Sequence, residues 1–245
     1  MPLKKKALVL SASENTIATI AEKAKVLGIY QPNLYLGTAA GALVCLFVPI
    51  REYNALDQLI GDYTAYYQED DGVRHFVNKL LGTKPSLRSI VEHHYTPVLH
   101  AELVGNQTPV VVGLVNLTTA EIEYFDVSLM DYAQTMLVVL ASIQHPCQNP
   151  IKIHEHHYAD ATLFVQNHVL YVMDRDFDEI DVLVPRLRNP TQNVPWQPTT
   201  PLSVAERLFA LLRDFRPEFQ DYSVLTIAEA RRIVTRLRYL DDTVD

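Results

Sequence analysis

The stretch Leu34-Tyr35-Leu36-Gly37-Thr38-Ala39-Ala40-Gly41-Ala42-Leu43 decides the fold of this 245-residue chain. It begins as an apolar strand pattern and continues as an apolar helix, with Gly37 and Gly41 at the change. Glycines at this spacing let a strand turn sharply into a helix without side-chain clashes. The pattern predicts a nucleophile elbow, in which Ala39 stands where a hydrolase carries serine. An alanine methyl group cannot attack a carbonyl.

Strand and helix patterns alternate along the rest of the chain. Short strands are expected at 7–11, 109–119, 121–125 and 179–185, and helices at 14–27 and 129–143. The apolar run from residue 39 to 50 fits a buried helix that follows the elbow. Alternation of this kind favours an α/β fold, with a mostly parallel sheet and helices on both faces.

Five short motifs, taken in order, resemble the patatin-like phospholipase family. The matching stretches read ALVLSASENTI from residue 7, LGTAAGAL from 36, VVVGLVNLTTAEI from 110, LASIQHP from 140 and YADAT from 158. The resemblance covers roughly residues 7 to 185. It implies a patatin-like three-layer sandwich, and it implies a lipid acyl hydrolase site built on a serine and aspartate dyad. Asp160 matches the dyad aspartate, and Ala39 replaces the dyad serine.

The chain departs from the family pattern where the chemistry would occur. The glycine-rich oxyanion loop of the family is replaced by a segment that begins Ala12, Ser13 and Glu14. Backbone amides stabilise an oxyanion only where the chain can approach it, and losing one such donor slows an enzyme about a hundredfold or more. The glycines that follow the dyad aspartate are also replaced, by Ala161 and Thr162.

Three functional hypotheses follow from these departures. The leading one is a catalytically degenerate pseudo-phospholipase that binds a lipid or acyl ligand, or regulates a protein partner such as an active relative. A homo-oligomer is a further candidate assembly. The first alternative is an active acyl-ester hydrolase, or one inactivated by an engineered serine change at Ala39. The second is a structural assembly protein. Because three parts of the site differ together, natural degeneration fits better than a single designed substitution.

Composition limits the binding partners and the cellular location that we expect for the chain. A net charge of -8 argues against nonspecific binding to nucleic acid. No apolar run is long enough to cross a bilayer, and no secretory signal is visible. Cys45 and Cys147 suit a reducing compartment, so a cytoplasmic location is expected.

The domain organisation is expected to have three parts. A patatin-like domain spans 1–187, a proline-rich linker spans 188–202, and a helical extension spans 203–245. Two helices are expected in the extension, at 203–215 and 226–240, because each begins with a capping-box pattern. They are expected to pack on the main domain or on a partner.

His154, His156 and His157 form a dense cluster in which a metal site is one interpretation. Two histidines two residues apart on a strand point to the same face, as some metal sites require. No third and fourth ligand can be identified, so a polar strand edge is the preferred interpretation. The sequence predicts neither a metal nor a cofactor.

Overall fold

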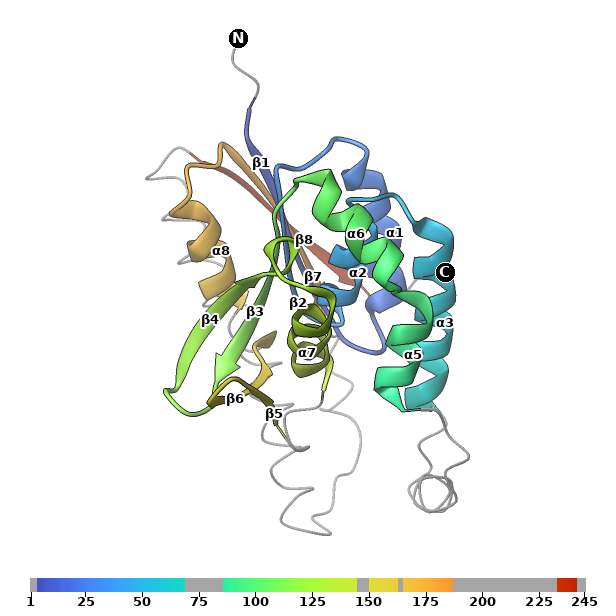
Figure 1. The fold of residues 1–245 in the computed structure, drawn as a ribbon. Coiled ribbons are helices and arrows are strands. Elements are labelled where there is room, and N and C mark those ends of the chain that lie inside the picture. The colour runs from blue at the N-terminus through green and yellow to red at the C-terminus, as the bar shows by residue number, and fades with distance from the viewer. Residues whose placement is uncertain (1–3, 69–85, 145–149, 163–164, 187–232, 242–245) are drawn as a thin grey trace, which may run out of the picture.

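The computed structural model describes residues 4–68, 86–144, 150–162, 165–186 and 233–241 (Figure 1). Strands and helices alternate through most of these ranges. The strands are β1 (Lys6–Ala12), β2 (Leu34–Ala39), β3 (Val110–Asn116), β4 (Glu121–Asp126), β5 (Ile151–Ile153), β6 (His156–Asp160), β7 (Glu179–Arg186) and β8 (Val234–Asp241). The helices are α1 (Ile17–Gly28), α2 (Gly41–Phe47), α3 (Tyr53–Gln68), α5 (Leu87–His94), α6 (Pro97–Asn106), α7 (Tyr132–Ile143) and α8 (Val165–Met173), with a short 3-10 turn at Val127–Leu129.

The strands form one eight-stranded sheet in the order β5-β6-β3-β2-β1-β7-β8, and β4 also pairs with β3. The strands from β3 through β8 in this order pair in parallel, whereas β4, β5 and β6 pair antiparallel. Buried parallel strands read as continuous apolar runs, as β1 does from Ala7 to Leu10. The predicted α/β class with a mostly parallel sheet is confirmed.

Helices cover both faces of the sheet (Figure 1). On one face, Leu8 and Leu10 of β1 pack in a large apolar core with α1, α2, α3, α5 and α7. On the other face, Val9 packs with Val169 and Val172 of α8 in a smaller core. The alternation along β1 is the two-residue period of a strand that is buried on both faces. None of the helices within the described ranges is both long and apolar enough to cross a membrane.

Most of the expected elements are present. The predicted strands at 7–11, 109–119, 121–125 and 179–185 correspond to β1, β3, β4 and β7. The helix expected at 129–143 begins later, at Tyr132, because the Asp131 side chain accepts a hydrogen bond from the Gln134 amide and so caps the helix there. The helix expected after the elbow is α2, and every one of its residues is buried.

The helix predicted at 226–240 is wrong from Val234 onwards, where the chain forms β8 (Val234–Asp241). This strand pairs in parallel with β7 over its whole length, from Glu179 opposite Val234 to Arg186 opposite Asp241. Polar and apolar residues alternate only over 236–239, and pairing with the edge of β7 gives the backbone groups of the strand partners that a local pattern cannot reveal. Part of the predicted helical extension therefore belongs to the main sheet. The linker at 188–202 and the helix at 203–215 lie outside the described residues.

The edge of β3 that faces β2 is shared by two partners. Its first half pairs with β2, as far as Gly37 opposite Val112. Its second half pairs with β6, beginning at Leu114 opposite Asp160. The end of β6 therefore arrives where β2 leaves the sheet, and this brings Asp160 to the elbow.

A buried histidine secures the turn after β6. The fully buried His168 of α8 lies against Gly113 of β3, where an added Cβ would be 2.6 Å from the imidazole Cε1 atom. Its Nε2 lies 3.2 Å from the Ala161 carbonyl oxygen, and its Nδ1 lies 3.2 Å from the Tyr124 hydroxyl. A carbonyl only accepts, so Nε2 carries the proton and the neutral ring accepts from Tyr124. Burial lowers the pKa of His168 from 6.5 to about 4.

We expect His168 to make the fold sensitive to acid. Because its folded-state pKa is depressed, its neutral form stabilises the protein above pH 6.5, and this stability is lost as the pH falls towards 4. The loss is about 3 kcal/mol, since one pKa unit corresponds to roughly 1.4 kcal/mol. Urea unfolding of the His168→Gln variant should show a smaller fall between these pH values than the parent chain. The exposed His157→Gln variant should keep the parental fall, and an equal fall in all three would contradict the assignment.

Candidate functional site at the elbow

Ala39 holds the backbone conformation of an elbow residue. It ends β2 with a φ of 50°, in the left-handed region that residues other than glycine rarely adopt. Two hydrogen bonds fix the turn on either side of it. The Ala40 amide donates to the Ala12 carbonyl at 3.0 Å, and the Ser142 hydroxyl donates to the Ala39 carbonyl at 3.2 Å. Ser142 lies in the LASIQHP stretch that the motif comparison singled out.

Both elbow glycines are required by close packing. A Cβ at Gly37 would lie 2.6 Å from the Ala42 Cα atom, and one at Gly41 would run into the carbonyl of Leu10 in β1. These contacts are with backbone, which cannot move aside as a flexible side chain can. The predicted sharp turn from strand to helix is therefore confirmed. The correspondence of Ala39 to a family nucleophile stays a prediction.

Asp160 lies beside the elbow and is held by two threonines. The Thr38 hydroxyl donates to its Oδ1 atom at 3.4 Å. Thr162 donates twice, from its amide to Oδ1 at 2.9 Å and from its hydroxyl to Oδ2 at 2.5 Å. The sequence anticipated that Asp160 would lie near the elbow, but motif order gave no sign of these threonine contacts. The side chain that reaches Asp160 comes from Thr38, one residue before the nucleophile position.

Thr38 cannot act as a nucleophile in place of the serine that the resemblance leads us to expect at position 39. Its side chain is fully buried, whereas a nucleophile must reach a substrate carbonyl. Ser11 is its register partner on β1 and is also fully buried, with no hydrogen-bond partner for its hydroxyl within the described part of the chain. Ala39 itself is 9% exposed. The surface of the elbow therefore presents a methyl group and no hydroxyl from these two residues.

The loop after β1 is organised to start a helix. The Ser13 amide donates to the Thr16 hydroxyl at 2.9 Å, while the amides of Thr16 and Ile17 donate to the Ser13 carbonyl at 3.1 and 3.0 Å. This loop is the segment that the resemblance assigns to an oxyanion hole. Because its Ser13 amide is already bonded within the loop, that amide is not presented to a ligand.

Two carboxylates give the elbow a negative field. Burial, together with the charges of Glu14 and Asp160, raises the pKa of Tyr67 to about 12. The pKa of its neighbour Tyr63 is raised by burial and by the same two carboxylates. A field that disfavours a tyrosinate also disfavours an oxyanion at the same place. The two rings are 5.0 Å apart and pack within α3, as their helical spacing predicts.

The histidine cluster does not form the expected strand face. His154 has a φ of 53° and lies in the turn between β5 and β6, so it does not share a strand with His156. Across the ranges that the structure describes, no three histidine, cysteine, aspartate or glutamate side chains are grouped as metal ligands would be.

Cys45 lies in the core, and burial raises the pKa of its thiol, so it is unreactive. Cys147 lies outside the described residues.

We expect the Ala39→Gly variant to be more stable than the parent chain. Glycine adopts a positive φ without the steric cost that alanine incurs, so the gain should be about 1 kcal/mol. Ala120→Gly, at an exposed turn position with a φ of 60°, should change stability in the same direction. Ala101→Gly, on an exposed helical position of α6, should instead lose about 1 kcal/mol. Urea unfolding measures the free energy of unfolding of all three variants. A lower value for Ala39→Gly than for the parent chain would argue against a strained elbow.

The sequence was compared with models of known protein families and with curated proteins. No family model matches it, and no curated protein matches it significantly. The assignment of Ala39 and Asp160 to family positions therefore rests on motif order and local geometry.

Proposed function

We propose that the chain is a catalytically silent, patatin-like protein that acts by binding. The observation that carries this proposal is the elbow itself. Ala39 keeps the strained backbone of a nucleophile but presents only a methyl group. A fold that kept this turn for catalysis would need a hydroxyl there, whereas a binding scaffold needs only the packing of α2 against the sheet.

The charges around the elbow support the same proposal. Acyl transfer develops negative charge on the substrate oxygen, and hydrolases place donors or positive charge to receive it. Here Glu14 and Asp160 act on the neighbouring tyrosines with negative charge, and the Ser13 amide is bonded within its own loop. The Ala39→Ser substitution would add one hydroxyl group but would leave the two negative charges and the bonded Ser13 amide in place. It would therefore not create the donors that a hydrolase requires.

The negative field of Glu14 and Asp160 also limits which ligands can bind near the elbow. An acyl chain with a neutral head group meets no repulsion from Glu14 and Asp160, whereas a fatty-acid carboxylate or a phosphate does. The preferred ligand is therefore a neutral acyl lipid, and a protein segment without acidic side chains is the alternative.

The Ala39→Ser variant tests the absence of catalysis. We expect its hydrolysis of p-nitrophenyl butyrate to stay within about tenfold of the parent chain, because losing even one oxyanion donor slows a hydrolase a hundredfold or more. The double variant Ala39→Ser, Asp160→Asn is the matched control. Strong hydrolysis by Ala39→Ser that the double variant lacks would support an engineered knockout and overturn the proposal. Parental turnover that survives rigorous purification and disappears in Asp160→Ala would overturn it too.

Binding of fluorescent acyl probes tests the ligand class. A neutral monoacylglycerol probe should bind about tenfold more tightly than a fatty acid with the same chain, which corresponds to about 1.4 kcal/mol of repulsion. Glu14→Gln should reduce this preference, whereas Glu22→Gln, on an exposed position of α1, should leave it unchanged. If neither probe binds, the lipid branch of the proposal fails, and protein binding remains to be examined by crosslinking at Ala39→Cys.

A further inference from the structure

A pocket lies at the opposite end of the sheet from the elbow. It encloses about 250 Å³ where β1 and β7 begin and α1 ends. One wall is apolar, and the other carries charges of both signs. The apolar side chains are Leu27, Tyr30 and Pro32, and the charged ones are Lys6, Glu179 and Asp181.

The basic side of the pocket keeps unused binding capacity. Lys6 Nζ lies 3.9 Å from Glu179 Oε2, which is an ion pair but is too long for a hydrogen bond, and 5.5 Å from the centre of the Tyr30 ring. Within the described residues, no acceptor lies at hydrogen-bonding distance from this ammonium group. Its side chain is 35% exposed. An ammonium group has three donors, so Lys6 can bind an anionic group in the pocket.

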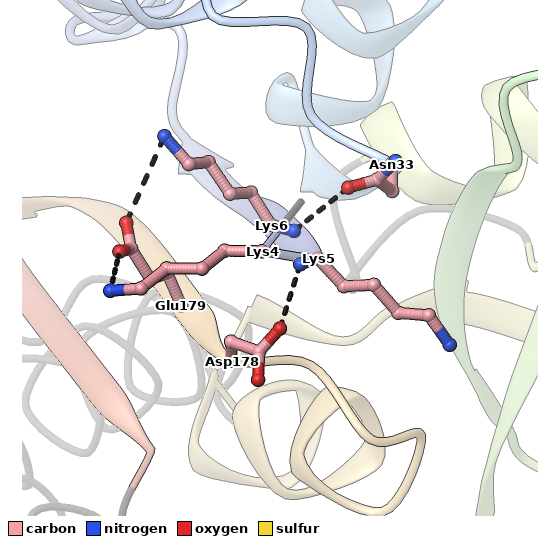
Figure 2. A network of polar contacts seen from close by, with 6 residues as sticks. All are labelled: Lys4, Lys5, Lys6, Asn33, Asp178 and Glu179. Atoms are coloured by element: carbon pink, nitrogen blue, oxygen red, sulfur yellow. Dashed lines mark hydrogen bonds and ion pairs between the residues drawn. The ribbon is translucent and has the colours of Figure 1, made fainter. Parts of the chain in front are cut away.

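The acidic side is formed by β7. The Glu179 side chain is 9% exposed and accepts a hydrogen bond from Lys4 Nζ at 2.8 Å (Figure 2). Asp181 follows two residues later and therefore lies on the same face of the strand. Both carboxylates already have partners. A carboxylate has about four acceptor sites, so one that already has a partner can still accept a hydrogen bond from a ligand. This side of the pocket can bind an ammonium group.

Backbone hydrogen bonds hold the two sides in place. Lys6 and Glu179 are register partners in the parallel ladder of β1 and β7. The Lys5 amide donates to Asp178 Oδ2 at 2.8 Å, and the Lys6 amide donates to Asn33 Oδ1 at 2.9 Å (Figure 2). The backbone positions of Lys6 and Glu179 are therefore fixed on neighbouring strands, so little ordering of the backbone is needed when a ligand binds.

We propose that this pocket binds a small zwitterion of the amino-acid type. Its carboxylate would pair with Lys6, its ammonium group with Glu179 and Asp181, and its apolar side chain would lie against Tyr30 and Leu27. The volume equals that of about eight water molecules, which suits a free amino acid. This inference does not depend on the function proposed for the elbow.

Ligands with other charges fit the pocket less well. An anion would meet Glu179 and Asp181, and a cation would meet Lys4 and Lys6, in each case without a partner for the remaining side. An uncharged apolar molecule would cover charged groups without replacing their hydration. Only a ligand with both charges matches both sides.

Isothermal titration of the full chain with L-phenylalanine tests the proposal. Two analogues each lack one charge: 3-phenylpropanoate has no ammonium group, and phenethylamine has no carboxylate. We expect saturable binding of L-phenylalanine, and binding of each analogue at least about tenfold weaker, because each loses a charge-assisted hydrogen bond. This comparison uses the parent chain, so it does not depend on any variant folding.

Two lysine variants locate the site. Lys6→Met keeps the aliphatic stem and should weaken L-phenylalanine binding at least about tenfold while leaving phenethylamine binding no weaker. Lys5→Met is the matched control, because its side chain extends away from Glu179 (Figure 2) and should leave both affinities unchanged. The proposal is overturned by the absence of saturable L-phenylalanine binding, by equal affinity for the three compounds, or by a Lys6→Met variant that melts normally and binds as the parent does.

Discussion

Helix α2 approaches the sheet so closely that backbone touches backbone. Gly41 leaves no room for a side chain against the Leu10 carbonyl, and Gly37 leaves none against Ala42. This approach buries every residue of α2 in the larger core and forces the chain at Ala39 into a positive φ. The burial of seven apolar or small residues is what offsets the strain at one position.

Packing and chemistry are separable at this elbow. The contacts that fix the turn are made by backbone atoms, by two glycines and by the Ser142 hydroxyl. None of these contacts involves the Ala39 side chain. A residue can therefore change at position 39 without loss of the turn, provided that it tolerates the backbone conformation. The Asp160 carboxylate is likewise held by Thr38 and Thr162, so it keeps its place without a serine partner. We regard this separation as the physical reason why a catalytic arrangement can be lost while its fold remains.

Local sequence signals predicted the parts of the fold that depend on local physics. The glycine spacing indicated the elbow, and apolar runs indicated β1 and β3, because a strand buried on both faces is mostly apolar. The strand β8 escaped prediction, because Val234, Leu237 and Leu240 follow helical spacing, whereas the strand is fixed by pairing with the distant edge of β7. At the site, motif order anticipated Asp160 near Ala39, but the internal bonding of the Ser13 amide depends on how one loop folds onto Thr16. No residue type on its own reveals that geometry.

The contact between Gly113 and His168 links two positions that are 55 residues apart in the sequence. The imidazole occupies the volume that any side chain at position 113 would need, and it also binds the carbonyl that follows Asp160. A larger residue at 113 must therefore be accompanied by a smaller one at 168. Among descendants of this chain, these two positions are expected to change together, and a lineage that exchanges them would also have to find another way to hold the turn after β6.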